Sequence, residues 1–398
     1  MNNSNKGYGK IYTGDIVLIA VFLFSIFIHT EFSAVFFGVF SLRKFFFLCT
    51  IPFFILALRY RANSMFFVVV AATYILLLVG NIFVSDYLVD QRTLFSLLTY
   101  CIPFVFTNKF FNSWGEKGIK YSFFVSLILL TMWKNIGLFS AWNPNCIAYL
   151  FFGGINLYLF IPFHFKKYRR GTMGDIFYFM AFLYGIYLLF NTESRNVMIA
   201  EIVVVFMVVF KRITTKKYIY SVVALIAIAY PALMVAFNEL ILNNEKLFDV
   251  LLTISNEWFG KNTVFDGRLL LQREALEAIN VHPIMGYGHM PNLDGLATHN
   301  NYLTMRYSIG VLGVLLCGVF LVVLFKKAYA NFSGDSNDDI SFVCISILVG
   351  FLIQLGAESF LFGNDLIVLM PYFFMGCIIY RNIHIRNGNS ADVDLLKE

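Results

Sequence analysis

Residues 218–241 read YIYSVVALIAIAYPALMVAFNELI, and this stretch decides the fold class. Its only charged residue is Glu239. A helix needs about 20 consecutive apolar residues to cross the hydrocarbon core of a bilayer. Backbone polar groups in lipid need internal partners, which a helix supplies. The stretch is therefore predicted to be a membrane-spanning helix.

The rest of the chain has the same character. Of its 398 residues, 59% are hydrophobic and 14% are charged, and the mean hydropathy is +0.73. Soluble domains carry about 25% charged residues, so soluble and disordered classes are excluded. We predict an all-α polytopic membrane protein with about 12 transmembrane helices, at residues 15–31, 41–58, 64–83, 93–107, 121–138, 146–165, 174–190, 197–210, 218–241, 302–325, 340–362 and 366–380.

The basic residues predict the orientation. About two thirds of the 30 lysines and arginines fall in alternate short connections, which places both termini in the cytoplasm. The net charge of +6 is thus sorted by membrane side and gives no reason to expect nucleic acid as a partner. The remaining cations fall on the outer side, and they are Arg43, Lys44, Arg92, Lys134, Arg195, Lys246, Lys261, Arg268, Arg273 and Arg306.

One outer connection is much longer than the others. It divides the chain into helices 1–9 at residues 1–242, a loop at 243–302, and helices 10–12 with a cytoplasmic tail at 303–398. Loops of this length are functional or disordered. This one is predicted to hold a short helix at 267–280, capped by Asp266 and ended by Pro283. The loop is acidic overall, so any anion site in it must be a local clamp of arginines.

A polar run closes this loop and opens the tenth predicted helix. His299, Asn300, Asn301 and Tyr302 put an imidazole and two amides at the mouth of the helix bundle. There they are placed to meet a polar head group whose lipid tail stays in the bilayer. The alternative is that His299 is an ordinary interfacial residue.

Two arginines are candidates for binding phosphate. Arg195 lies in a very short outer turn, and Arg268 begins the predicted loop helix. A guanidinium group offers a planar fork of donors that fits phosphate oxygens, and a cation at a membrane boundary is a functional candidate. The alternatives are a pair with Glu193 or an interfacial anchor for Arg195, and plain solvation for Arg268.

Other candidates carry weaker signals. Asn143 and Asn145 flank Pro144, where a helix cap competes with amide contact to a sugar. Arg43, Arg273 and Tyr287 complete the substrate-binding candidates. The six cysteines lie in or beside apolar runs without CxxC spacing, so they are interpreted as small core residues. The sequence shows no HExxH, GxSxG or P-loop motif, and we expect no metal site and no cofactor.

Four groups of residues follow one another in the order of the motifs of a known family. They are Asn143-Pro144-Asn145; Thr192-Glu193-Ser194-Arg195; Gly267-Arg268 with Ala275-Leu276 and Pro283, Gly286-Tyr287-Gly288; and His299-Asn300-Asn301-Tyr302-Leu303 followed by Gly310 and Gly313. Together with the loop position they resemble the O-antigen polymerase/ligase superfamily of bacterial envelope glycan assembly.

The resemblance implies a GT-C-like glycosyltransferase on the periplasmic face of the bacterial inner membrane. Its donor and acceptor would be undecaprenyl-pyrophosphate-linked glycans, and a chain-length regulator protein would be a further partner besides the lipid bilayer. By position, Arg195 and Arg268 would hold the pyrophosphate. His299 would be the base or the orienting group for the acceptor hydroxyl, supported by Asn300.

The particular activity is open between two members of this superfamily. We favour the polymerase, which joins lipid-linked repeat units, because such Phe-rich chains, here with 47 phenylalanines, resemble polymerases. The alternative is the ligase, which transfers the polymer to the lipid A core. A flippase or other transporter is a third reading; it predicts paired repeats and intramembrane ionisable residues, for which Glu201 and Glu358 are the candidates.

Overall fold

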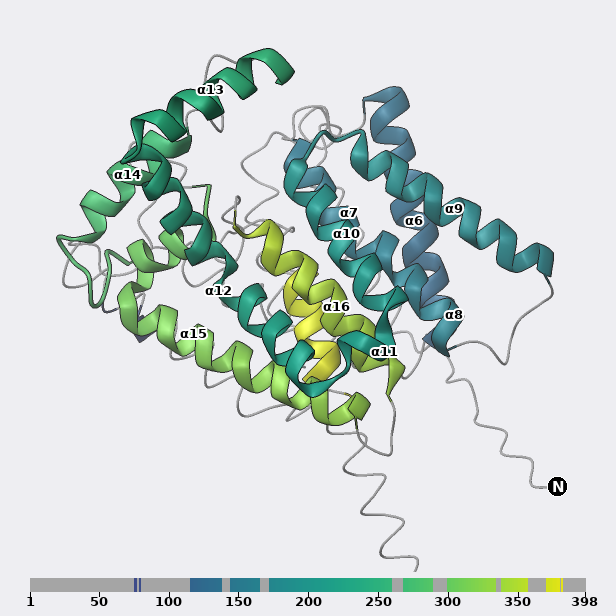
Figure 1. Ribbon diagram of the computed structural model, residues 1–398. Helices are drawn as coiled ribbons and strands as arrows, with labels where there is room; N and C mark the ends of the chain where they lie inside the picture. The colour runs from purple at the N-terminus through teal and green to yellow at the C-terminus, as the bar shows by residue number, and fades with distance from the viewer. Residues whose placement is uncertain are drawn as a thin grey trace, which may run out of the picture.

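The computed structural model describes residues 75, 76, 79, 115–137, 144–164, 172–259, 268–288, 299–333, 338–356, 370–379 and 381. Every regular element in these ranges is helical (Figure 1). The labelled elements are α6 (Gly115–Ile136), α7 (Pro144–Asn156), η2 (Leu157–Leu159), α8 (Phe160–His164), α9 (Thr172–Phe190), α10 (Arg195–Val209), α11 (Lys211–Thr214), α12 (Lys217–Leu242), α13 (Glu245–Phe259), α14 (Arg268–Ile279), α15 (Asn301–Ser333) and α16 (Asp339–Gln354).

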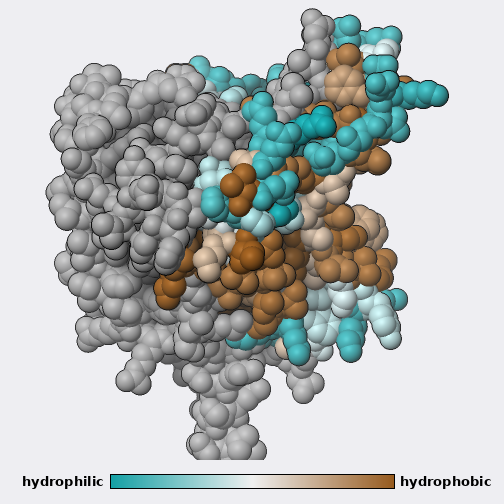
Figure 2. Space-filling view, turned by 90° about the vertical axis from the view of Figure 1, so that its left-hand side faces the viewer, coloured by the Kyte–Doolittle hydropathy of each residue, from teal (hydrophilic) through white to brown (hydrophobic). Residues whose placement is uncertain are grey.

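The helices confirm that the chain is a membrane protein. Four segments are long and apolar enough to cross a bilayer: Pro144–Pro162, Met173–Phe190, Lys217–Leu242 and Asn301–Ser333. Two shorter apolar helices, Asp339–Gln354 and Met370–Ile379, pack inside the bundle. Figure 2 shows a hydrophobic belt across the described part of one face, with hydrophilic residues above and below it. A belt of this kind fits the lipid-facing surface of a bundle.

The predicted spans overlap the helices wherever both can be compared. The eight predicted segments from 121–138 onward each contain or overlap a described helix. The predicted loop helix at 267–280 is α14. The segments 15–31, 41–58 and 93–107 lie outside the described residues, as does 64–83 apart from residues 75, 76 and 79.

The loop differs from its prediction in one element. A second helix, α13, precedes α14, where the sequence analysis expected one helix in the loop. Its Leu247 and Leu251 share one helical face and pack with Ile241 and Leu269. The amphipathic pattern of α13 is therefore satisfied by the end of α12 and the start of α14.

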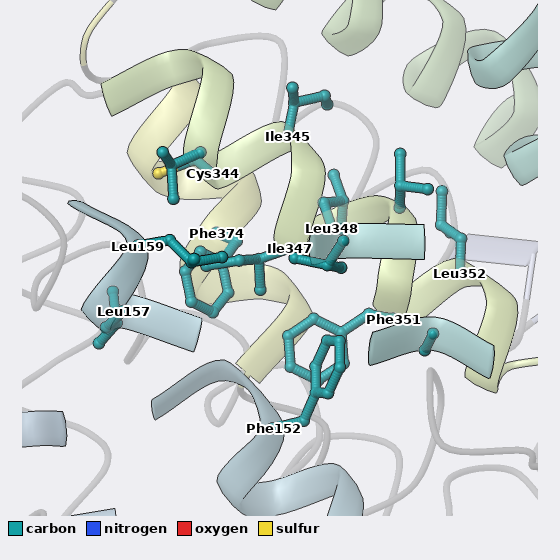
Figure 3. Close-up of a cluster of buried hydrophobic side chains, with 14 of the residues drawn as sticks. Phe152, Leu157, Leu159, Cys344, Ile345, Ile347, Leu348, Phe351, Leu352 and Phe374 are labelled. Atoms are coloured by element: carbon teal, nitrogen blue, oxygen red, sulfur yellow. The ribbon is translucent and has the colours of Figure 1, made fainter. Parts of the chain in front are cut away.

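The core of the bundle lies between α7, α10, α16 and the helix Met370–Ile379. Figure 3 shows Phe152, Phe351 and Phe374 among aliphatic side chains of this cluster. The rings of Phe152 and Phe351 lie with their centroids 5.2 Å apart at an interplanar angle of 73°, an edge-to-face geometry that aromatic pairs favour. Gly350 allows the Phe152 ring to pack closely against α16, because a Cβ at residue 350 would lie 2.5 Å from that ring. Cys344 and Cys377 are buried in the same cluster, as expected.

Ion pairs mark one end of the bundle. Lys211, just after α10, pairs with Asp339 at the start of α16. Arg381 bonds Asp338, with 2.8 Å between Nη2 and Oδ1. Because the end of α10 meets the start of α16, the two helices run antiparallel. The start of α10 therefore lies beside the end of α16, at the opposite end of the bundle.

That opposite end carries the long loop, and we call it the loop end. Val235, late in α12, packs with Leu303, early in α15, and with Ala275 of α14. The end of α12, the start of α15, the end of α16 and the start of α10 thus share the loop end. In Figure 1, α13 and α14 cover this end beside α12 and the start of α15.

Candidate functional site

The tenth predicted span is broken close to its start. α15 is interrupted at Gly310, whose backbone angles are φ 62° and ψ −169°. Val311 and Leu312 therefore cannot donate to Tyr307 and Ser308 in the regular helical pattern. The sequence predicted one continuous helix at 302–325, and the break at Gly310 corrects that prediction.

The loop segment 283–288 repairs the broken pattern. The backbone N–H groups of Tyr287 and Gly288 donate to Tyr307 O at 2.7 Å and Ser308 O at 2.9 Å. In return, Val311 N donates to Pro283 O at 3.0 Å, and Leu312 N to Ile284 O at 3.4 Å. Buried backbone groups are satisfied in this way without a continuous helix. The loop is thereby fixed to α15.

Two glycines make this backbone contact possible. A Cβ on Gly310 would lie 2.1 Å from Ile284 O, and a Cβ on Gly286 would lie 2.6 Å from Tyr307 O. Both glycines also have positive φ, 62° and 71°, which other residues adopt only at a cost. A Cβ on Gly286 would also lie 2.7 Å from Gly310 N. Gly286 and Gly310, which belong to two of the sequence groups that carried the family resemblance, are therefore in direct contact.

Asn300 holds the loop end together. Its Nδ2 donates to Pro231 O at 2.9 Å and to Gly356 O at 2.7 Å, which joins α12 to the end of α16. Its Oδ1 accepts from Tyr302 N at 2.9 Å and Leu303 N at 3.2 Å, which caps α15. The residue is 0% exposed. Its amide is fully engaged inside the protein, so it positions the start of α15.

His299 stands directly before this cap. Its φ is 45°, in the left-handed region, and its side chain is half-buried. Non-glycine residues with such backbone conformations cluster at functional sites. The buried bonds of Asn300 fix the neighbouring backbone, so His299 is held at the loop end, at the boundary between the loop and the first turn of α15.

The next residues of α15 face different surroundings. Asn301 is buried, and its Nδ2 lies 3.1 Å from the Sδ of Met305. Tyr302 is half-buried, and the guanidinium of Arg306 lies 5.8 Å from its ring centre. Arg306 was counted only as an outer cation by the sequence analysis. The signal that marks it is an arginine inside an otherwise apolar span.

The two predicted phosphate-binding arginines begin two different helices at the loop end. Arg195 is the first residue of α10 and is exposed; it follows the turn at Glu193, which has a φ of 57°. Arg268 is the first residue of α14 and is half-buried beside Leu269. α10 packs along α16, while α14 packs on α12 and α15. α16 also contacts α15. The helices that begin with Arg195 and Arg268 are therefore connected through α16 and α15.

The Tyr287 side chain is engaged in contacts within the protein. Its ring stacks on Tyr307 with centroids 4.6 Å apart, and its hydroxyl donates to Ala278 O at 2.9 Å. Desolvation raises the pKa of the Tyr287 hydroxyl above its usual value, so the group stays a neutral donor. Arg273 is exposed on α14.

The remaining candidates are placed less fully. Asn145 is the second residue of α7 and is half-buried. Asn143 and Arg43 lie outside the described residues. Within the described ranges, no group of three or more His, Cys, Asp or Glu residues gathers where it would hold a metal ion.

Glu201 is buried inside the bundle, as the transporter reading required, but it is paired. It lies on α10 with 1% of its surface exposed, and its Oε2 accepts from Asn156 Nδ2 at 2.8 Å. Glu201 Oε1 and Asn156 Oδ1 are buried without a hydrogen-bond partner. Glu358, the second intramembrane acid, lies outside the described residues.

Together, the fold and the site define a helical membrane protein. In it, the loop segment 283–288 is bonded to α15 at the break at Gly310, and His299 and Asn300 precede the first turn of the same helix. Residues 180–318, from the middle of α9 to the middle of α15, match the family described as O-antigen ligase. Over this segment, the match confirms the resemblance to the O-antigen polymerase/ligase superfamily. Members of that family are glycosyltransferase-like enzymes. A comparison with curated proteins gives no match.

Proposed function

We propose that this protein is an O-antigen polymerase. It would join undecaprenyl-pyrophosphate-linked repeat units by glycosyl transfer on the periplasmic face of the bacterial inner membrane, with both termini in the cytoplasm. The observation that carries the proposal is the fixed His299 at the loop end, inside the segment that matches the family. A span count of about twelve and a GT-C architecture belong to the same proposal.

The reaction requires two kinds of group at this end of the bundle. An acceptor hydroxyl oxygen attacks the anomeric carbon of the donor, and the bond from that carbon to the phosphate oxygen breaks. The electron pair leaves with undecaprenyl diphosphate, where Arg195 and Arg268 stabilise the developing charge. The hydroxyl proton passes to His299, acting as general base. Because arginines carry the charge, no metal ion is required in this scheme.

The positions of the side chains suit these roles. The Arg195 and Arg268 side chains lie at the end of the bundle that carries the loop, where a lipid-linked diphosphate would meet water. The buried bonds of Asn300 hold the backbone next to His299, which supports a role that needs a fixed position. Asn300 itself supports this geometry from inside the protein.

A second candidate is the O-antigen ligase. The family that matches residues 180–318 is described by that activity. The ligase would use the same lipid-linked donor but accept the lipid A core. Both activities need the same anion-binding and hydroxyl-activating groups, and they differ in the acceptor.

The first experiment deletes the gene and examines the lipopolysaccharide on gels. Loss of a polymerase leaves a single repeat unit on the core. Loss of a ligase leaves bare core while lipid-linked polymer accumulates. Bare core with lipid-linked polymer would overturn the polymerase proposal in favour of the ligase.

The second experiment complements the deletion with variants. His299→Ala and Arg268→Ala should each abolish the ladder of chain lengths, because each removes a group that acts in the transition state. Arg212→Ala, an exposed arginine at the opposite end of the bundle, should restore the ladder fully. Full ladders from both His299→Ala and Arg268→Ala would contradict the assigned roles.

A further inference from the structure

Arg306 is a cation in the same polar segment as His299. It lies on α15 four residues after Tyr302, so the two side chains share a helical face. Side chains on a helix lean towards its N-terminus. The guanidinium of Arg306 does so, lying 5.8 Å from the centre of the Tyr302 ring. The positive charge therefore lies beside Tyr302 in the first turn of α15, the turn that follows His299 in the chain.

One nitrogen of this guanidinium has no hydrogen-bond partner in the part of the chain that the structure describes. That nitrogen is the buried Nε, and among the described lysines and arginines no other has such a nitrogen. At the other end of the bundle, by contrast, Lys211 and Arg381 are paired with Asp339 and Asp338. Burying part of a cation without a partner is costly. A buried donor in that state is available to a bound anion.

The backbone N–H groups at the start of α15 already have acceptors within the protein, so an anion there would be bound by side chains. The N–H groups of Tyr302 and Leu303 already donate to Asn300 Oδ1. The N–H of Asn301 donates to Leu355 O at 3.0 Å. These donors at the start of α15 are thus taken by the protein itself, whereas a free helix start would offer them to an anion.

We propose that Arg306 binds an anionic group of the substrate beside His299, through its guanidinium. The group is a phosphate of the lipid carrier or a carboxylate on the glycan, since both present paired oxygens to the donor fork. This proposal rests on the proposed function and adds a third arginine to it. Unlike Arg195 and Arg268, Arg306 lies on the same helix that begins beside His299.

The test measures binding to the full-length protein in lipid nanodiscs. One probe is undecaprenyl phosphate, and the other is a water-soluble oligosaccharide that ends in glucuronic acid. Arg306→Gln should weaken binding of one probe by about 10- to 100-fold, as for the loss of a charge-assisted hydrogen bond. Arg306→Lys keeps the charge and should lose less. Arg212→Gln is the matched control and should bind both probes like the wild type.

The two probes separate the two sources of the anion. Weaker binding of undecaprenyl phosphate alone assigns Arg306 to the carrier, and weaker binding of the oligosaccharide alone assigns it to the glycan. Unchanged binding of both probes by Arg306→Gln overturns the proposal, as does a wild-type protein that binds neither. The Lys variant serves as the test if the Gln variant does not fold.

The outcome is distinguishable from a failure of the proposed function. A full chain-length ladder with His299→Ala would contradict the glycosyl-transfer mechanism, whatever the binding data show. A lost ladder with His299→Ala, combined with unchanged probe binding by Arg306→Gln, would contradict the role of Arg306 alone.

Discussion

Around Phe351 the helices meet through apolar side chains, whereas at Gly310 a loop and a helix meet through their backbones. In the first region α7, α10 and α16 interlock around Phe152 and Gly350. In the second, residues 283–288 and 307–312 exchange four backbone hydrogen bonds. Side-chain packing tolerates hydrophobic substitutions that keep the total volume, because neighbouring side chains can repack. A backbone contact does not, because a carbonyl cannot move without its helix.

This difference separates a supporting region from a positioning one. The packed core gives the bundle its shape, and the loop end places His299 and Tyr302 relative to that core. Helices interrupted beside a polar site recur in membrane proteins, because irregular backbone is tolerated only where it is satisfied by protein or lines a cavity. Substitutions in the two regions are therefore expected to differ in size and kind.

The largest effect is expected for Gly310→Ala. The added Cβ would lie 2.1 Å from Ile284 O, at a residue with a φ of 62°. Strain at such a residue costs up to about 3 kcal/mol, and losing the exchanged hydrogen bonds adds to it. We expect a melting temperature well below that of the wild type in detergent, together with loss of the glycan ladder.

Gly318→Ala is the matched control for this prediction. It lies on the same helix, and a Cβ there meets nothing within 4 Å. Its stability should stay within about 1 kcal/mol of the wild type. Equal melting temperatures for the two variants would show that the backbone contact does not hold the loop end.

A smaller loss is expected for Asn300→Ala. The change removes the cap of α15 and leaves the carbonyls of Pro231 and Gly356 without this donor. The expected cost is about 2–4 kcal/mol, measured as a lower melting temperature. Asn300→Asp keeps an acceptor for the cap but turns oxygen towards both carbonyls, so it should not restore stability.

His299→Ala provides the contrast to this prediction. It should keep the melting temperature of the wild type and lose the ladder, because its role is chemical. If Asn300→Asp proved as stable as the wild type, the donor bonds to α12 and α16 would not be what holds α15 in place.

The smallest effect is expected in the core, for Glu201→Gln. A glutamine amide can donate to Asn156 Oδ1, which is buried without a partner in the structure. The stability should change by less than about 1 kcal/mol, and the ladder should be unchanged. Glu201→Val removes one of the two acceptors of the buried Asn156 Nδ2 and leaves its bond to Phe152 O, so it should cost more. Complete loss of function in a stable Glu201→Gln protein would instead favour the transporter reading.

The sequence predicted the helices well where apolar length alone determines them. The spans at 174–190 and 218–241 match α9 and α12 within a few residues, because a stretch of this length in lipid can only be a helix. The amphipathic pattern at 267–280 likewise predicted α14. The order of the polar groups predicted the family, since such groups are local and are read directly from the chain.

The candidate site was predicted in part. His299, Arg195 and Arg268 lie at the same end of the bundle, because helix polarity follows from the order of the spans, and their roles stay predictions. The buried role of Asn300 was not predicted, since its partners Pro231 and Gly356 are more than fifty residues away on either side. The sequence did not single out Arg306, because the burial of its Nε without a hydrogen-bond partner among the described residues is a property of its surroundings.

The amino-acid sequence by itself determined a bundle of membrane helices, its long loop and the polar residues at its mouth. Those features depend on composition and on the 3.6-residue period of a helix, which each segment carries alone. Only the tertiary structure decided that α15 breaks at Gly310 and that the loop segment 283–288 completes it. A backbone bond between distant segments leaves no periodic trace in either one, so it emerges only when the chain has folded.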